Sequence, residues 1–275
     1  MAARTSGSLT LLDKSPGVVE LVRRCATFVA KTESRAKARP TVGHPIVDGV
    51  YVNGHGPYKF LVDTGTNVNF IEVNLARSIG LKTTFRTPLT SSTGATFVSG
   101  GDGIEVLLDS AKADSQAFLF LPLEAIHDIT PGVQGVLGQE FLSRFDYTLD
   151  LKGKRLEFGK QDRNGTRAQF KMINAEPVVS TSLGDLILDS GARQLVLFGV
   201  HPDIGYGLTG ELRTATGSQQ IGLVFGKPLI IEGRKISRGD AVTIPNRTPG
   251  VDGLLPLSLF QSIYFCNSQG YVVFE

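Results

Sequence analysis

Short alternating runs of apolar and polar residues dominate the chain from His44 onward. Residues 46–54 alternate in this way and end in Asn53-Gly54, a dipeptide typical of tight hairpin turns. Similar runs, separated by Gly, Asn, Asp and Pro, continue to the last residue. The pattern therefore predicts an all-β fold for this part of the chain.

The first 43 residues follow a different pattern. Apolar residues recur at roughly helical spacing from Pro16 to about Lys37, which predicts one amphipathic helix, and the rest of the segment resembles a tail. The segment is basic, with eight Lys or Arg against three Asp or Glu.

An internal repeat organises the remaining residues. Each half carries, in the same order, an Asp-Thr/Ser-Gly tripeptide after an apolar strand, a polar hairpin containing Gly, and an apolar block. The hairpin glycines, Gly94 and Gly217, follow Asp63 and Asp189 by 31 and 28 residues. Three landmarks in one order predict two similar lobes.

We therefore expect four parts in the chain. These are a basic tail or helix at 1–43, an N-terminal lobe at 44–160, a linker at 161–167 and a C-terminal lobe at 168–275. Each lobe is expected to close in a similar way, through residues 145–158 in the first and 263–274 in the second.

The two tripeptides have a simple physical logic. An Asp that ends an apolar strand is held in a fixed, dry position, and a Gly two residues later lets two loops approach closely. The hydroxyl groups of Thr64 and Ser190 can then hydrogen-bond across the junction and satisfy buried backbone groups. The apolar blocks at 136–137 and 254–255 would support the loops from behind.

Asp63-Thr64-Gly65 and Asp189-Ser190-Gly191, each with its downstream apolar block, resemble the aspartic peptidases. The resemblance covers about residues 44–275. Pepsin-like members carry both lobes in one chain, whereas retropepsins assemble them from two chains, and the short lobes here resemble the retropepsin style duplicated in one chain. The resemblance implies two pseudo-two-fold-related acid-protease β-barrel lobes with a cleft between them.

The resemblance also implies a catalytic role for Asp63 and Asp189, with Thr64, Gly65, Ser190 and Gly191 supporting the loops. Two carboxyl groups about 3 Å apart share a proton, because like charges at that distance repel. One can act as general base on a water molecule while the protonated one polarises the scissile carbonyl. This chemistry requires neither a metal nor a cofactor.

The polar hairpins at 89–97 and 213–220 are expected to fold over the cleft as flaps. They would offer backbone groups to an extended peptide by strand addition. The residues that we expect to bind substrate in this way are Ser92, Thr93, Gly94, Thr216 and Gly217. Peptides or unfolded proteins would be the substrates, and a monomer would suffice because one chain supplies both aspartates.

Three departures from the family pattern keep another interpretation open. Pro256 stands where the family usually has Gly, Arg193 follows closely on Asp189, and neither flap contains the Tyr usual in pepsin-like enzymes. A catalytically silent protein that binds peptides or a protein partner in the same cleft is therefore the alternative. A third interpretation is an interaction module that acts through the basic helix.

The basic segment 1–43 likewise has two interpretations. It is a pro-segment whose Lys or Arg lies across the acidic pair, or a solvated tail or partner-binding helix, and the second is favoured. No secretion signal is recognisable, which favours a cytoplasmic location. Export remains the alternative if the true start lies upstream.

Composition excludes several other classes. The net charge is +2, and residues 44–275 are slightly acidic, which argues against nucleic-acid binding. No apolar run approaches the roughly 18 to 20 residues that would span a membrane. Cys25 and Cys266 lie near opposite ends of the chain, without the spacing of a disulfide framework or a zinc site.

Overall fold

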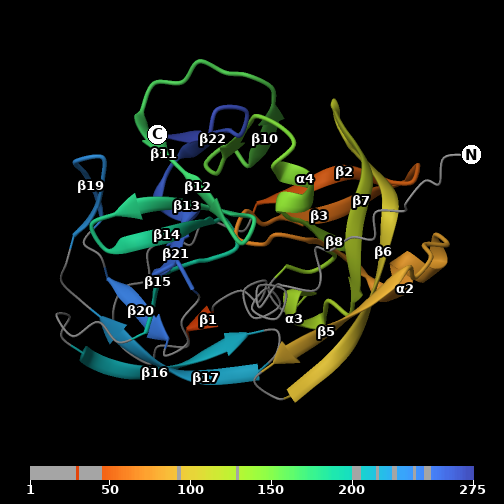
Figure 1. Ribbon diagram of the computed structural model, residues 1–275, viewed down its shortest axis with the longest axis horizontal. Helices are drawn as coiled ribbons and strands as arrows, with labels where there is room; N and C mark the ends of the chain where they lie inside the picture. The colour runs from red at the N-terminus through yellow and green to blue at the C-terminus, as the bar shows by residue number, and fades with distance from the viewer. Residues whose placement is uncertain are drawn as a thin grey trace, which may run out of the picture.

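The structure is a computed structural model that describes residues 29–30, 45–91, 94–127, 130–199, 206–214, 217–224, 228–237, 240–244 and 249–275. It is nearly all β, as the alternating pattern predicts, and it confirms the two-lobed architecture. Figure 1 shows the first lobe on the right, in orange to yellow-green, and the second on the left, in green to blue.

The first lobe is built on a seven-stranded sheet in the order β2-β3-β8-β4-β7-β6-β5. An additional β2–β6 pairing closes six of these strands into a ring, so the lobe is a small barrel. Its elements are β2 (Ile46–Val52), β3 (His55–Val62), β4 (Asn69–Glu72), α2 (Val73–Ser78), β5 (Phe85–Ser91), β6 (Gly94–Leu108), β7 (Ala111–Leu121), α3 (Glu124–His127), β8 (Gly135–Leu137) and α4 (Gln139–Leu142).

The second lobe repeats this connectivity. Its nine-stranded sheet has the order β1-β16-β17-β20-β15-β21-β14-β13-β12, and β14 lies parallel to β21 as β3 lies parallel to β8. The elements are β12 (Lys171–Ile173), β13 (Glu176–Thr181), β14 (Gly184–Asp189), β15 (Leu195–Phe198), β16 (Tyr206–Thr214), β17 (Gly217–Val224), β18 (Leu229–Ile231), β19 (Arg234–Ser237), β20 (Ala241–Ile244), β21 (Gly253–Pro256) and the 3-10 turn η1 (Leu257–Leu259).

One strand of the second sheet comes from the N-terminal segment. β1 (Val29–Ala30) pairs antiparallel with β16, so these two residues are extended rather than helical as expected. The rest of the helix predicted at 16–37, and the pro-segment and tail interpretations of 1–43, lie outside the described residues.

A third sheet joins the two lobes at the top of Figure 1. The residues expected to close the two lobes, 145–158 and 263–274, pair with each other, because β9 lies antiparallel to β22. The five strands, in the order β10-β9-β22-β23-β11, are β10 (Arg155–Phe158), β9 (Tyr147–Asp150), β22 (Ser262–Cys266), β23 (Tyr271–Phe274) and β11 (Thr166–Gln169). The end of the expected linker, at Thr166 and Arg167, forms part of β11.

The core explains why the last residues before the two aspartates are apolar. On β14, Leu186 and Leu188 face the main core shared by both lobes, while Ile187 faces a smaller cluster within its own lobe. On β3, Val62 belongs to the main core and Leu61 to a smaller cluster of the first lobe. The ends of both strands are buried on both faces, so the alternation seen elsewhere is lost there.

Side-chain stacking reinforces the interlobe sheet. The rings of Tyr147 and Phe265, from β9 and β22, stack with centroids 4.8 Å apart and planes 16° apart. Asp146 also accepts hydrogen bonds from the Ser268 N–H (2.8 Å) and hydroxyl (2.7 Å). Among the described residues, no helix is both long and apolar enough to cross a bilayer.

We predict that Phe265→Ala lowers the free energy of unfolding by about 3–5 kcal/mol, because it empties a buried position where the lobes meet. Leu259→Ala is the control, since Leu259 is 41% exposed while Phe265 is fully buried. Urea unfolding of both variants measures the difference. Equal stabilities would contradict the role of this sheet as the joint between the lobes.

Candidate active site

The two aspartates of the repeated tripeptides end corresponding strands. Asp63 directly follows β3, and Asp189 is the last residue of β14. Both are buried, with 2% and 1% of their surface exposed. The adjacent strand supports each loop: the Asp63 N–H donates to the Leu137 carbonyl (3.0 Å) of β8, and Asp189 pairs with Pro256 of β21.

Reciprocal hydrogen bonds lock the two loops together. The hydroxyl of Thr64 donates to the Leu188 carbonyl (2.7 Å) and accepts from the Ser190 N–H (3.0 Å). The hydroxyl of Ser190 donates to the Val62 carbonyl (2.8 Å) and accepts from the Thr64 N–H (3.0 Å). Each hydroxyl therefore satisfies a buried donor and a buried acceptor of the opposite lobe, as predicted for these two residues.

The glycines of the tripeptides bring the carboxyl groups to the same place. A Cβ on Gly65 would lie 2.4 Å from Cγ of Asp189, and one on Gly191 would lie 2.8 Å from Oδ2 of Asp63. Each carboxyl group thus lies directly against the glycine of the other loop. Both positions require Gly, and the two aspartates meet where the lobes join.

Backbone N–H groups orient the carboxyl groups. The Gly65 N–H donates to Oδ1 of Asp63 (3.0 Å). Oδ1 of Asp189 accepts from the Gly191 N–H (2.7 Å) and from the Ala192 N–H (2.9 Å). These bonds hold each carboxyl group in a defined orientation.

Pro256 fits the second lobe because its neighbour differs as well. In the first lobe, the Gly138 N–H donates to Oδ1 of Asn69 (3.0 Å). The strand registers place Pro256 where Gly138 stands and Leu195 where Asn69 stands. Pro256 has no N–H to donate, and Leu195, in the place of Asn69, has no side-chain acceptor to satisfy. The two differences between the lobes therefore compensate each other.

Arg193, the other departure near Asp189, has intermediate exposure, unlike the buried aspartates. It corresponds in the repeat to Asn67, whose side-chain amide donates to the Asn174 carbonyl (3.1 Å) in the second lobe. Among the described residues, no group of three or more His, Cys, Asp or Glu side chains is placed to hold a metal ion.

The two expected flaps are hairpins in the structure. β5 pairs with β6 up to Ser91 and Gly94, and β16 pairs with β17 up to Thr214 and Gly217. Gly94 and Gly217 therefore begin the second strand of each hairpin. The other expected substrate-binding residues, Ser92, Thr93 and Thr216, lie outside the described residues.

Sequence reasoning missed two polar residues beside Asp63. Asn69 is the acceptor for Gly138, and Gln139 donates from Nε2 to the Thr64 carbonyl (2.8 Å). Both are buried. Comparison of the two halves could not reveal them as a pair, because Leu195 and Leu257 occupy their places in the second half. The signal in the sequence was Gln139 itself, a polar residue that follows the apolar block at 136–137 after one glycine.

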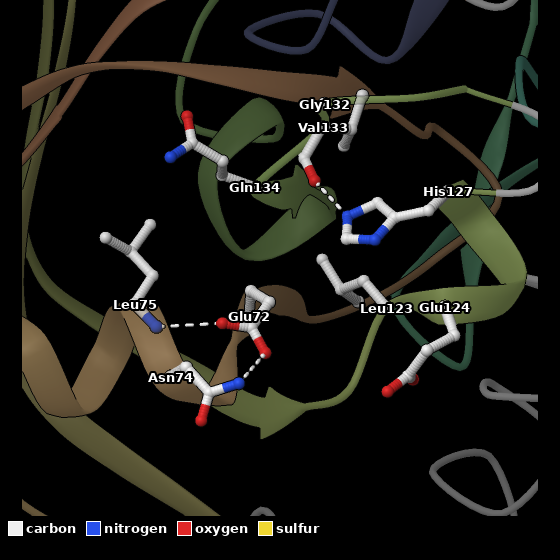
Figure 2. A pocket seen from close by; sticks show the side chains of 9 residues that line it. All are labelled: Glu72, Asn74, Leu75, Leu123, Glu124, His127, Gly132, Val133 and Gln134. Atoms are coloured by element: carbon white, nitrogen blue, oxygen red, sulfur yellow. Dashed lines mark hydrogen bonds between the residues drawn. The ribbon is translucent and has the colours of Figure 1, made fainter.

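A separate hollow of about 420 Å³ lies on the first lobe beside α2 and α3 (Figure 2). Glu72 and His127, two of the residues that line it, already have partners. Glu72 accepts from the Leu75 N–H (2.8 Å) and from Nδ2 of Asn74 (3.1 Å), and His127 bonds the Val133 carbonyl (2.7 Å). Since Glu72 caps α2, these bonds account for its position, and neither aspartate lines this hollow.

The fold and the site together define a two-lobed protein with one buried aspartate per lobe, in the arrangement of an acid protease. Comparison with known proteins agrees. Residues 49–141, the part of the first lobe that carries Asp63, match the family described as aspartyl protease. No curated protein matches the chain. The chain is thus an aspartic-peptidase-like protein.

A solved structure similar to the chain is the crystal structure of basic 7S globulin from soybean. It shares 11% identity at a TM-score of 0.45, and the match covers 84% of this chain and 95% of that one.

We predict that Thr64→Val costs about 2–4 kcal/mol of stability, because it leaves the Ser190 N–H and the Leu188 carbonyl buried without their partner. Thr66→Val is the matched control. Thr66 is equally buried on the same loop, but its hydroxyl makes no hydrogen bond, so its loss should cost less than about 1 kcal/mol. Chemical denaturation decides, and similar losses for both variants would show that the interlobe bonds contribute little.

Proposed function

We propose that the protein is an aspartic endopeptidase, which hydrolyses peptide bonds with a water molecule activated between Asp63 and Asp189. The observation that carries the proposal is that each of these buried carboxyl groups lies against the glycine of the opposite loop. Such a pair holds one proton between its members, because ionising both would place like charges together out of water.

The proposed reaction uses groups that this site contains. The ionised member of the pair removes a proton from the water as it attacks the scissile carbonyl. The protonated member donates a hydrogen bond to the carbonyl oxygen, where negative charge develops. The resulting tetrahedral intermediate collapses when the carboxyl group that took the proton from the water gives it to the amine nitrogen, which leaves as the C–N bond breaks. Reciprocal bonds between Thr64 and Ser190 hold the two carboxyl groups in position throughout.

The substrate is proposed to be an extended segment of a peptide or unfolded protein, lying between the lobes beneath the hairpins β5–β6 and β16–β17. Strand edges recognise such segments through backbone hydrogen bonds. A single chain supplies both aspartates, so the proposed active form is a monomer.

A catalytically silent protein that binds peptides in the same place is the second candidate. Pro256, Arg193 and the absence of a Tyr in the flaps are the sequence features that favour it. Pro256 is the weakest argument of these, because it pairs with Asp189 in the sheet and the carboxyl group of Asp189 keeps its hydrogen bonds from Gly191 and Ala192. The peptidase therefore remains the better-supported proposal.

We predict that Asp63→Asn and Asp189→Asn each reduce kcat/KM for an unfolded protein substrate by at least about 100-fold, because each removes one acid–base group. Asp109→Asn is the control, since Asp109 is exposed and its left-handed backbone (φ 51°) suits Asn. The native chain should show a bell-shaped dependence on pH between about pH 3 and 7, because one carboxyl must be ionised and the other protonated.

Mass spectrometry of the digests measures cleavage, and thermal melting shows that each variant is folded. Equal cleavage by the native chain and both aspartate variants would reject the mechanism. A native chain that binds unfolded peptides without cleaving them at any pH would establish the silent alternative.

A further inference from the structure

The two aspartates are held by different means, although their loops are related by the internal repeat. The Ala192 N–H donates to Oδ1 of Asp189 (2.9 Å). Its counterpart in the first lobe, the Thr66 N–H, donates instead to the main-chain carbonyl of Asp63 (3.5 Å). The two loops therefore differ in where this N–H group donates, which directs attention to the other contacts of the first loop.

Gln139 makes two of these contacts. It is the first residue of α4 and is 2% exposed. Its backbone N–H donates to the Thr66 carbonyl (2.8 Å), and its side-chain Nε2 donates to the Thr64 carbonyl (2.8 Å). In the second lobe this position is Leu257, which has no such donor.

The carbonyl that Gln139 binds belongs to the peptide group between Thr64 and Gly65. The N–H of the same peptide group donates to Oδ1 of Asp63 (3.0 Å). A peptide group is rigid and planar, so fixing its oxygen also fixes the direction of its N–H. A bond to the oxygen further polarises the group and strengthens the N–H as a donor.

We infer that Gln139 is a positioning residue for the carboxyl group of Asp63, acting through the Thr64–Gly65 peptide group. The inference rests on the proposed function, because it names how one member of the catalytic pair is held. Gln139 is buried and touches no substrate, so its effect falls on kcat rather than on KM.

Two substitutions at this position separate the role of the donor from the role of the volume. Gln139→Met keeps the length of the side chain and removes the donor. Gln139→Glu keeps a donor only while the new carboxyl group is protonated, which burial favours at acidic pH. The ionisable groups nearby include Asp63, across the peptide group, Asp189, which lies against Gly65, and Tyr147 on β9. Burial raises the pKa of Tyr147, so this residue stays neutral throughout the test.

We predict that Gln139→Met lowers kcat about 3- to 10-fold with KM unchanged, the effect of one lost hydrogen bond. Gln139→Glu should retain most of the native kcat at acidic pH and fall to the level of Gln139→Met as pH rises. Leu257→Met, the matched control in the second lobe, should leave kcat and its pH profile unchanged. Folded concentration is measured by thermal melting for every variant.

An NMR measurement makes the test independent of catalysis. The amide proton of Gly65 should move upfield in Gln139→Met, because its bond to Asp63 weakens, while that of Gly191 should stay in place. An unchanged Gly65 amide, or kcat losses in both Gln139 variants with the native pH profile, would overturn the inference. If the native chain cleaves nothing but the Gly65 amide still shifts, the positioning role stands and the proposed function fails.

Discussion

The structure depends on one set of contacts, the exchange of hydroxyl hydrogen bonds between Thr64 and Ser190. Thr64 and Ser190 lie just beyond the ends of β3 and β14, so their backbone N–H groups would be buried unpaired if either loop stood alone. The other lobe supplies the missing donor and acceptor in both directions. Because buried polar groups are costly to leave unpaired, this exchange holds the lobes in a single register and thereby sets where the two aspartates lie.

The two lobes share one topology but differ in the residues that surround each aspartate. Around Asp63, the polar residues Asn69 and Gln139 bond the backbone of the loop and its support. Around Asp189, the corresponding residues are Leu195 and Leu257, and additional backbone N–H groups bind the carboxyl group directly. The pair is therefore symmetric in position and asymmetric in environment. Such asymmetry suits a reaction in which one carboxyl group gives a proton and the other takes one.

The sequence predicted the repeat and the strands that lead to the two aspartates, but not which strands pair where the lobes join. Residues 145–158 and 263–274 were expected to close the two lobes in a similar way, and in the structure they form one sheet across the junction. Strand patterns show that a segment needs a partner without showing which partner it takes. The choice follows from the main core, in which Tyr147 and Phe265 stack across the two halves.

The sequence by itself determined the all-β architecture, the two-fold repeat and the identities of Asp63 and Asp189. These follow from local signals: alternation, turn residues, and an Asp-X-Gly tripeptide directly after a short apolar run. Only the tertiary structure decided that Gln139 reaches the Thr64 carbonyl and that Pro256 and Leu195 take the places of Gly138 and Asn69. The residues concerned lie more than 50 positions apart in the sequence. Whether their interactions stabilise the protein depends on which buried donors and acceptors the fold brings together.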